Sequence, residues 1–275
     1  RRDPRRWPRP IRIAVMCWGE LAGSVAGKIQ YTNIRPYFGW INQEVDWIEA
    51  PRALEGSAAF RQNTGKDAMI KLFGNFSHTD LSLYDHDIDD PASKQRYGLS
   101  NDYRYLNAAY KDPLNERWFL RGGVSYTTLT NGKTMGSVAS QTQEKGLHAK
   151  AVVEGTLSSS TELRTGVEMI HLDYSQDMAG TGSAFQEMII AGFAETDIYT
   201  SNSFVTRTGT RFEYNSLQQK VSVDPRVSLA YKTGAIGQVS LAYGKFRQSA
   251  GNEYLISQNN LAAEMADHYI LNYQR

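Results

Sequence analysis

The chain has 275 residues, of which 41% are hydrophobic, and its 30 basic and 29 acidic side chains give a formal net charge of +1. This balance gives no reason to expect nucleic acid or an anionic surface as a partner. Mean hydropathy is -0.49, and no apolar run approaches the roughly 18 residues that a membrane helix needs. A place in a membrane would therefore require a closed β-barrel, whose strands satisfy the backbone without long apolar runs.

The N-terminal segment differs from the rest of the chain. The first ten residues, RRDPRRWPRP, hold five arginines and one aspartate, and nothing after Pro10 continues this bias. We interpret them as a non-native start, with a basic arm as the alternative, and set residues 1–22 apart as a non-matching basic segment. The single cysteine, Cys17, excludes a disulfide within the chain. Arg12 interrupts the apolar stretch that could serve as a signal peptide, so we expect the natural start to lie upstream.

Alternation of apolar and polar residues with a period of two dominates the remaining sequence. The clearest segments, in chain order, are 117–126, 147–154, 162–169, 204–214 and 222–232. In 204–214 the even positions are uncharged and include Phe212 and Tyr214, whereas Arg207 and Arg211 occupy odd positions. We count about twelve such segments, most of about 10 to 13 residues. Globular strands average about 5 or 6 residues and tilted membrane strands need about 9 to 11, so the length favours membrane strands.

The connections between these segments alternate in length. Short turns are expected at 63–66, 111–115, 158–160, 200–202 and 232–236, and long loops at 81–99, 131–143, 175–183 and 249–265. The link 216–220 breaks the rule, and the best helix candidate is the short segment Asn259 to Ala266. Short turns at one rim and long loops at the other are typical of outer-membrane barrels. The sequence therefore predicts an all-β fold, an antiparallel transmembrane β-barrel that is partial, with a soluble sandwich or propeller as the alternative.

The C-terminal region carries the most specific pattern. A strand from Gln238 to Gln248 ends in Phe-Arg-Gln, and a loop leads from it to Leu261 and then to the segment Glu264 to Tyr269. The order and spacing of these elements resemble the late barrel of the TonB-dependent receptors. Residues 46–51 and 60–66 also resemble segments of that family.

The resemblance implies a fold and a function for the whole protein. Such receptors hold an N-terminal plug domain inside a barrel of about 22 strands, with a TonB box ahead of the plug. Neither is visible here, so we expect residues 23–275 to be a partial barrel of about twelve strands, roughly half of the whole. In the outer membrane, the intact protein would bind a scarce, bulky ligand at the cell surface and transport it into the periplasm.

The implied partners are outer-membrane lipid, TonB acting through the missing plug, and a small-molecule or oligomeric nutrient; no cofactor is implied. The first alternative is a soluble or surface-attached all-β binding module. The second is an outer-membrane β-barrel enzyme, for which the sequence would need converging serine, histidine and acidic residues. We find no such set and expect no enzymatic activity.

The sequence offers no recognisable catalytic or metal site. It contains no P-loop, His-Glu-x-x-His or Gly-x-Ser-x-Gly motif, and the five histidines lack metal-ligand spacing. An acidic cluster at residues 85–90 fails the EF-hand pattern because Arg96 stands where the bidentate glutamate is needed. We interpret this cluster as a solvated loop. The sequence thus predicts no catalytic residues and no metal site, and it leaves the ligand-binding residues unknown.

Five arginines are expected on the polar faces or at the strand ends: Arg164, Arg207, Arg211, Arg226 and Arg247. They could give the lumen a partly basic wall. Glutamates and aspartates stand beside them in the sequence, and we favour the interpretation that these acids pair with the arginines and neutralise the wall.

Overall fold

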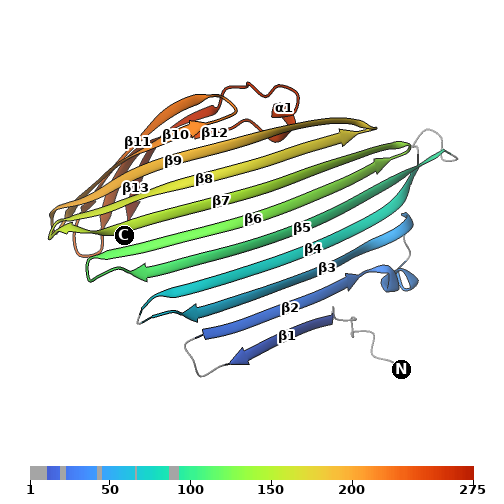
Figure 1. Ribbon diagram of the computed structural model, residues 1–275, viewed down its shortest axis with the longest axis horizontal. Coiled ribbons are helices and arrows are strands. Elements are labelled where there is room, and N and C mark those ends of the chain that lie inside the picture. Colours follow the sequence, from blue (N-terminus) through green and yellow to red (C-terminus); the bar gives the residue numbers. More distant parts are fainter. Residues whose placement is uncertain (1–10, 19–22, 42–44, 66, 87–92) are drawn as a thin grey trace.

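A single antiparallel sheet makes up almost all of the computed structural model, which describes residues 11–18, 23–41, 45–65, 67–86 and 93–275, with side chains from residue 23 on. Thirteen strands of this part pair in sequence order (Figure 1). They are β1 (Ile11–Trp18), β2 (Gly23–Asn33), β3 (Asp46–Asn63), β4 (Met69–His86), β5 (Lys94–Pro113), β6 (Trp118–Met135), β7 (Val138–Ser158), β8 (Thr161–Met178), β9 (Thr181–Ser201), β10 (Phe204–Asn215), β11 (Lys220–Lys232), β12 (Gln238–Gln248) and β13 (Glu264–Gln274). The predicted all-β antiparallel fold is confirmed, with thirteen strands where about twelve were expected.

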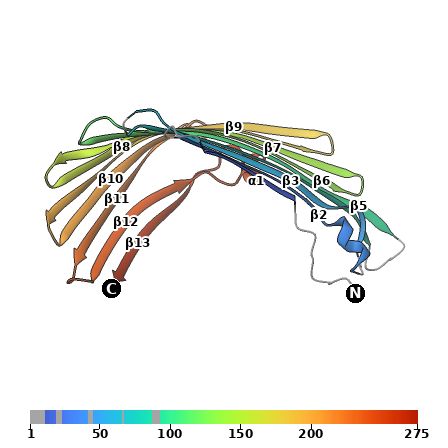
Figure 2. The same ribbon diagram turned by 90° about the horizontal axis from the view of Figure 1, so that it is seen from below.

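The sheet curves into an open trough (Figure 2). Its edges are β1 and β13, each of which pairs with one neighbour. β1 lies within the segment set apart as 1–22 and pairs with β2 from Ile11 opposite Tyr31 to Trp18 opposite Ser24. The edges do not meet, so the described strands do not close a barrel by themselves.

The strands β3 to β9, of 18 to 21 residues, are longer than the sequence predicted, and several connections are shorter, whereas β10 to β13, of 11 to 13 residues, have the predicted length. β7 and β9 have 21 residues each. The loops expected at 131–143 and 175–183 are instead strand extensions that end in tight turns, where Gly136 and Gly180 have positive φ values of 60° and 85°. Their many Thr, Ser and Gln residues indicated loops, but the same residues alternate and complete the hydrogen-bonded ladder. The short turns expected at the opposite rim are confirmed.

The acidic cluster lies in part outside the described residues. Its first two members, Asp85 and His86, belong to the end of β4, so the expected loop at 81–99 is wrong over 81–86 and from Lys94 on. Residues 87–92 are not among those described.

The helix expected at Asn259 to Ala266 is wrong. The structure places the one-turn helix α1 at Asn252–Leu255, together with the 3-10 helix Arg35–Gly39 between β2 and β3. Residues from Glu264 on form β13, which pairs with β12 along its whole length. The pairing explains the difference, because a strand partner outweighs a short segment's weak helical preference. No helix among the described residues is long and apolar enough to cross a membrane.

Side chains of opposite character lie on the two faces of the sheet. Residues that are paired across strands share a face. One ladder of paired residues is uncharged: Phe60, Leu72, Ala108, Val124, Ala149, Met169, Ile190 and Tyr214. The ladder one residue along is Arg61, Lys71, Ala109, Gly123, Lys150, Glu168, Ala191, Glu213 and Ser222.

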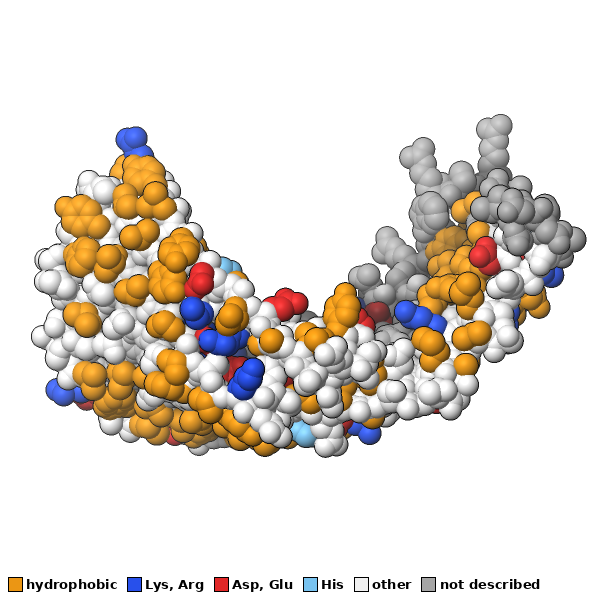
Figure 3. Space-filling model, turned by 90° about the horizontal axis from the view of Figure 1, so that it is seen from above, with side chains coloured by type: hydrophobic (Ala, Val, Ile, Leu, Met, Phe, Trp, Pro, Cys, Tyr) orange, Lys and Arg blue, Asp and Glu red, His pale blue; other side chains and the backbone are white. Residues whose placement is uncertain are grey.

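We call the convex side with the uncharged ladder the outer face, and the concave side the inner face. Figure 3 shows the trough as a U, with charged side chains gathered in its hollow and hydrophobic side chains over its outer side. Few hydrophobic side chains are buried in the described part, whereas many on the outer face are exposed, including Val167 at 62% and Leu241 at 53%. A soluble sheet of this size would cover such a face.

Candidate functional site

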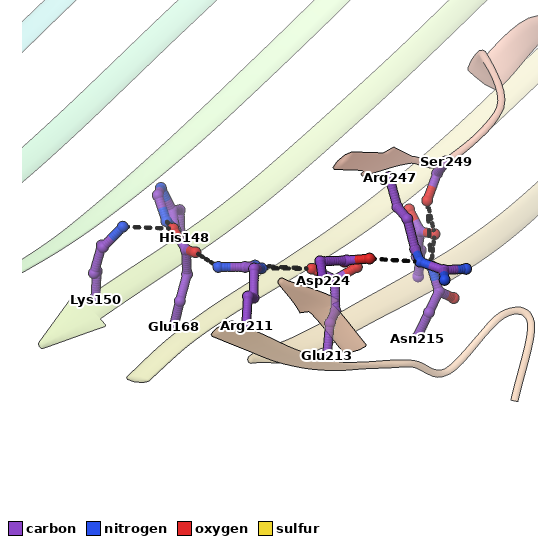
Figure 4. Close-up of polar contacts among 10 residues, drawn as sticks. His148, Lys150, Glu168, Arg211, Glu213, Asn215, Asp224, Arg247 and Ser249 are labelled. Atoms are coloured by element: carbon purple, nitrogen blue, oxygen red, sulfur yellow. Dashed lines mark hydrogen bonds and ion pairs between the residues drawn. The ribbon is translucent and has the colours of Figure 1, made fainter. Parts of the chain in front are cut away.

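Charged side chains of adjacent strands form a connected network on the inner face (Figure 4). Its centre is Glu168 on β8, whose carboxylate contacts His148 Nε2 at 2.8 Å and Lys150 Nζ at 3.5 Å, both from β7. The other carboxylate oxygen accepts a hydrogen bond from Arg211 on β10. The same guanidinium pairs with Glu213 at 2.9 Å. Three cationic or titratable partners around one carboxylate give a compact, mutually satisfied cluster.

A second group of ion pairs lies on the same face nearer the short-turn rim. Glu154 on β7 forms an ion pair with Arg121 of β6 at 2.6 Å and accepts a hydrogen bond from Arg164 of β8 at 3.1 Å. Arg164 also lies 3.9 Å from Glu195 on β9. Arg164 stands directly opposite both Glu154 and Glu195 in the register, and Arg121, which is opposite Val152, reaches Glu154 diagonally, so the sheet itself positions these groups.

Two further arginines have a single carboxylate partner each. Arg207 on β10 donates from Nε to Asp197 on β9 at 2.6 Å and from a second guanidinium nitrogen at 2.7 Å. Arg247 at the end of β12 donates to Asp224 on β11 at 2.8 Å. The predicted pairing is therefore confirmed for four of the five arginines, and Arg226 is the exception within the described part of the chain.

The link between β12 and β13 folds into the trough instead of extending from the rim, as Figure 2 shows for α1. Glu187, on the inner face of β9, accepts hydrogen bonds from Asn215 at 2.6 Å and from the hydroxyl of Ser249. Asn252 donates to Glu144 on β7 at 3.1 Å. Leu255 is only 1% exposed. Polar contacts and a buried apolar side chain thus hold the link 249–263 against the inner face.

The cluster around Glu187 was not predicted, because its members lie far apart along the chain. Ser249 and Glu187 are 62 residues apart. No local pattern signals such a contact. It arises only once the register of β9, β10 and β12 is fixed.

The inner face of β3 and β4 has a different charge pattern. Arg61 and Lys71 stand directly opposite each other. No ion pair of either is present among the described residues. Like charges at opposed positions are destabilising. Most arginines of β6–β12 are therefore paired with acids, whereas the wall is basic at Arg61 and Lys71.

A hollow of about 590 Å³ lies on the inner face between β8–β12 and the folded link. Three arginines, Arg211, Arg226 and Arg247, and three carboxylates, Glu187, Glu213 and Asp224, contribute to its lining. Ile170, Ile189 and Phe246 add apolar surface. Such a mixture can bind a solute through charge and apolar contact together.

The histidines lie in separate environments. His78 contacts Asp102 at 3.0 Å, His171 lies 3.5 Å from Asp173, and the ring of His268 packs on Phe246 with centroids 4.7 Å apart. Within the described residues, no three His, Cys, Asp or Glu side chains come together as a metal-binding group.

Comparison with known proteins gives similarity of structure but not of sequence. No protein-family model matches the chain, and no curated protein matches it in sequence. The sheet is similar to part of the barrels of siderophore receptors. The chain is similar over 96% of its length to 52% of the siderophore receptor PiuA from Acinetobacter baumannii, with a TM-score of 0.72 and 8% identity.

Two other receptors give the same result. For the ferric enterobactin receptor PfeA from Pseudomonas aeruginosa, in its G324V form, the TM-score is 0.67 at 10% identity, over 91% of this chain and 45% of that one. For the ferric yersiniabactin uptake receptor FyuA from Yersinia pestis the TM-score is 0.61 at 12% identity, over 95% of this chain and 48% of that one. The chain thus spans about half the length of these receptors. At this identity the likeness shows the fold alone.

Proposed function

We propose that residues 23–275 form part of the barrel wall of a TonB-dependent receptor in a bacterial outer membrane. The observation that carries this proposal is the pair of adjacent ladders. The uncharged one crosses eight strands, from Phe60 to Tyr214, without a charged side chain. Its neighbour carries charge at five positions: Arg61, Lys71, Lys150, Glu168 and Glu213. This is the alternation of a wall with lipid on one side and a wet lumen on the other.

The positions along the strands at which charges appear on the outer face support the same placement in a membrane. On β3 the outer positions from Phe60 to Leu54 are uncharged, and the first charge is Arg52, which pairs with Asp80 at 2.6 Å. On β8 the outer positions are uncharged from Leu163 to Met169 and then reach His171. Towards the short turns the uncharged outer positions continue to Gln62 on β3 and Thr161 on β8, so each stretch spans nine residues, within the about 9 to 11 residues of a tilted membrane strand.

The function that follows is transport. The intact protein binds a scarce, bulky ligand at the cell surface and passes it through the lumen to the periplasm, with energy from TonB acting on a plug domain. The similar structures are receptors for siderophores, by their names. A ferric siderophore is therefore the first ligand class to test. The barrel wall anchors the receptor in lipid and lines the path.

Fractionation of cells that produce the protein tests this proposal. The protein is expected in the outer membrane, to resist washing with alkaline carbonate and to need detergent for extraction. A known outer-membrane barrel and a periplasmic protein, followed in the same preparation, serve as controls. Recovery in the soluble fraction would contradict the proposal and favour the soluble binding module.

A further inference from the structure

Among the five arginines expected on the polar face, Arg226 is the one with no ion pair in the described part of the chain. Its Nε atom is buried and has no hydrogen-bond partner among the described residues. The side chain lines the hollow of about 590 Å³ and also a second one of about 330 Å³ along β6–β11. A buried donor without a partner is costly, so its presence at a hollow requires an explanation.

The register explains why Arg226 has no partner. The positions directly opposite it are Gly209 on β10 and Gly244 on β12. Neither has a side chain. By contrast, the position opposite Arg207 is Asp197, and those opposite Arg164 are Glu154 and Glu195.

Carboxylates that share the two hollows with Arg226 are engaged elsewhere. Asp224 pairs with Arg247 at 2.8 Å. Glu195 lies 3.9 Å from Arg164. Glu213 pairs with Arg211 at 2.9 Å. Arg226 therefore adds uncompensated positive charge to a wall whose other arginines are balanced.

An aromatic ring covers one side of the guanidinium. The carbon Cζ of Arg226 lies 4.7 Å from the ring centroid of Phe246. A Cβ atom at Gly244 would lie 2.9 Å from this ring, so glycine there gives the ring its place. Stacking on an aromatic ring holds a guanidinium in one orientation and leaves its nitrogen edge free for a planar anion.

We propose that Arg226 and Phe246 form a binding site on the inner wall for the carboxylate of an organic solute with an apolar body. Guanidinium binds carboxylate through two parallel hydrogen bonds. Phe246, Ile170 and Ile189 supply apolar surface in the same hollow. The site rests on the proposed function for its setting, since the inner face meets solutes only if it lines a transport path.

Titration of the purified full-length protein in a non-ionic detergent tests the site. Benzoate is the probe, and benzamide is its neutral isostere; binding is followed by saturation-transfer NMR. Benzoate is expected to bind saturably and benzamide at least tenfold more weakly. The variant Arg226→Gln is expected to lose at least tenfold in affinity for benzoate. Arg226→Lys keeps the charge but not the planar fork, and is expected to bind between the two.

The variant Phe246→Leu provides a second test that leaves every charge in place, and is expected to weaken benzoate binding several-fold. Arg207→Gln, on β10, removes an arginine that already has a partner and is the matched control; its affinity for benzoate is expected to stay within twofold of that of the unmodified protein. Electrophoretic mobility before and after heating checks that each variant is folded.

The proposal is overturned if the unmodified protein does not bind benzoate, if benzamide binds equally well, or if Arg226→Gln binds as the unmodified protein does. The last outcome includes the case in which a carboxylate of the protein itself already occupies Arg226.

The two proposals fail in different experiments. A protein that binds benzoate through Arg226 but fractionates as soluble would refute the membrane barrel and leave the carboxylate site. A membrane protein with no response at Arg226 would refute the site and leave the barrel.

Discussion

The two ladders of paired residues lie one residue apart on the same strands, yet they differ in almost every chemical property. Along the outer ladder no position carries a charge, and residues such as Val124 and Ile190 leave 44% and 47% of their surface exposed. Along the inner ladder the charges at Lys150 and Glu168 are matched across strands at 3.5 Å. The comparison teaches that this sheet is not stabilised by a packed core. On the proposed placement, each face instead contacts a different medium, lipid outside and water inside.

The largest expected effect comes from the two edge strands, β1 and β13, each of which pairs with only one neighbour among the described strands. The 275-residue chain alone is expected not to form a closed native barrel. β1 and β13 would expose unpaired N–H and C=O groups to hydrocarbon, where each costs several kcal/mol. After refolding in detergent, the chain should show no heat-dependent shift in electrophoretic mobility. A heat-modifiable, protease-resistant monomer would contradict this expectation.

The second largest effect is expected from a new charge, which should impair assembly when it is placed on the outer face and not when it is placed on the inner face. Leu241, on the outer face of β12, stands between Leu229 and Leu271, whereas its neighbour Ser240 stands between Ala230 and Asn272 on the inner face. Leu241→Arg is expected to impair assembly, at a cost of up to about 2–4 kcal/mol at the bilayer midplane and less near its surface. Ser240→Arg can stay wet and should assemble normally. With each change made in the full-length protein, the yield of its heat-modifiable form in the outer membrane measures both, and equal yields would mean that the faces are misassigned.

Removing the centre of the inner network should have a smaller effect. Glu168→Gln leaves Arg211 and Lys150 without their shared carboxylate, and we expect a loss of about 1–3 kcal/mol in the free energy of unfolding. Denaturant titration in detergent, monitored by tryptophan fluorescence, gives this quantity. Glu116→Gln makes the same chemical change in the exposed short turn between β5 and β6 and should have almost no effect. Similar losses of unfolding free energy for the two variants would show that the network around Glu168 does not stabilise the fold.

The smallest expected effect is a gain. Lys71→Glu converts the opposed like charges on β3 and β4 into an opposite pair with Arg61, worth about 0.2–1 kcal/mol. The same denaturant titration would detect it, and Lys71→Gln separates relief of repulsion from new attraction. A destabilised Lys71→Glu would show that Lys71 already has a partner of opposite charge.

The sequence predicted the faces well because alternation is a local property. The opposition of Phe212 and Tyr214 to Arg207 and Arg211 is visible from neighbouring letters, and the structure keeps it. The pairing of Arg164 with Glu154 was also within reach, because a short turn joins their strands and fixes the register.

Other features depend on register over longer distances or on turn geometry. The strand extensions around Gly136 and Gly180 were expected as loops, since polar residues occur in both. Arg226 was expected to pair as the other arginines do. Its isolation follows from Gly209 and Gly244 on two other strands, which only the assembled sheet brings beside it.

The length of the strands has a consequence for the surface of the cell. A strand of 21 residues such as β7 extends about 70 Å along its axis, which at a tilt of about 40° is roughly 50 Å along the membrane normal. An apolar band is only about 25 Å tall. On the proposed placement, about half of a long strand such as β7 therefore stands above the lipid, and β3 to β9, of 18 to 21 residues, form a stiff rim of paired strands there. Ligands, antibodies and phages approaching the cell would meet a rigid rim that includes the tight turns at Gly136 and Gly180.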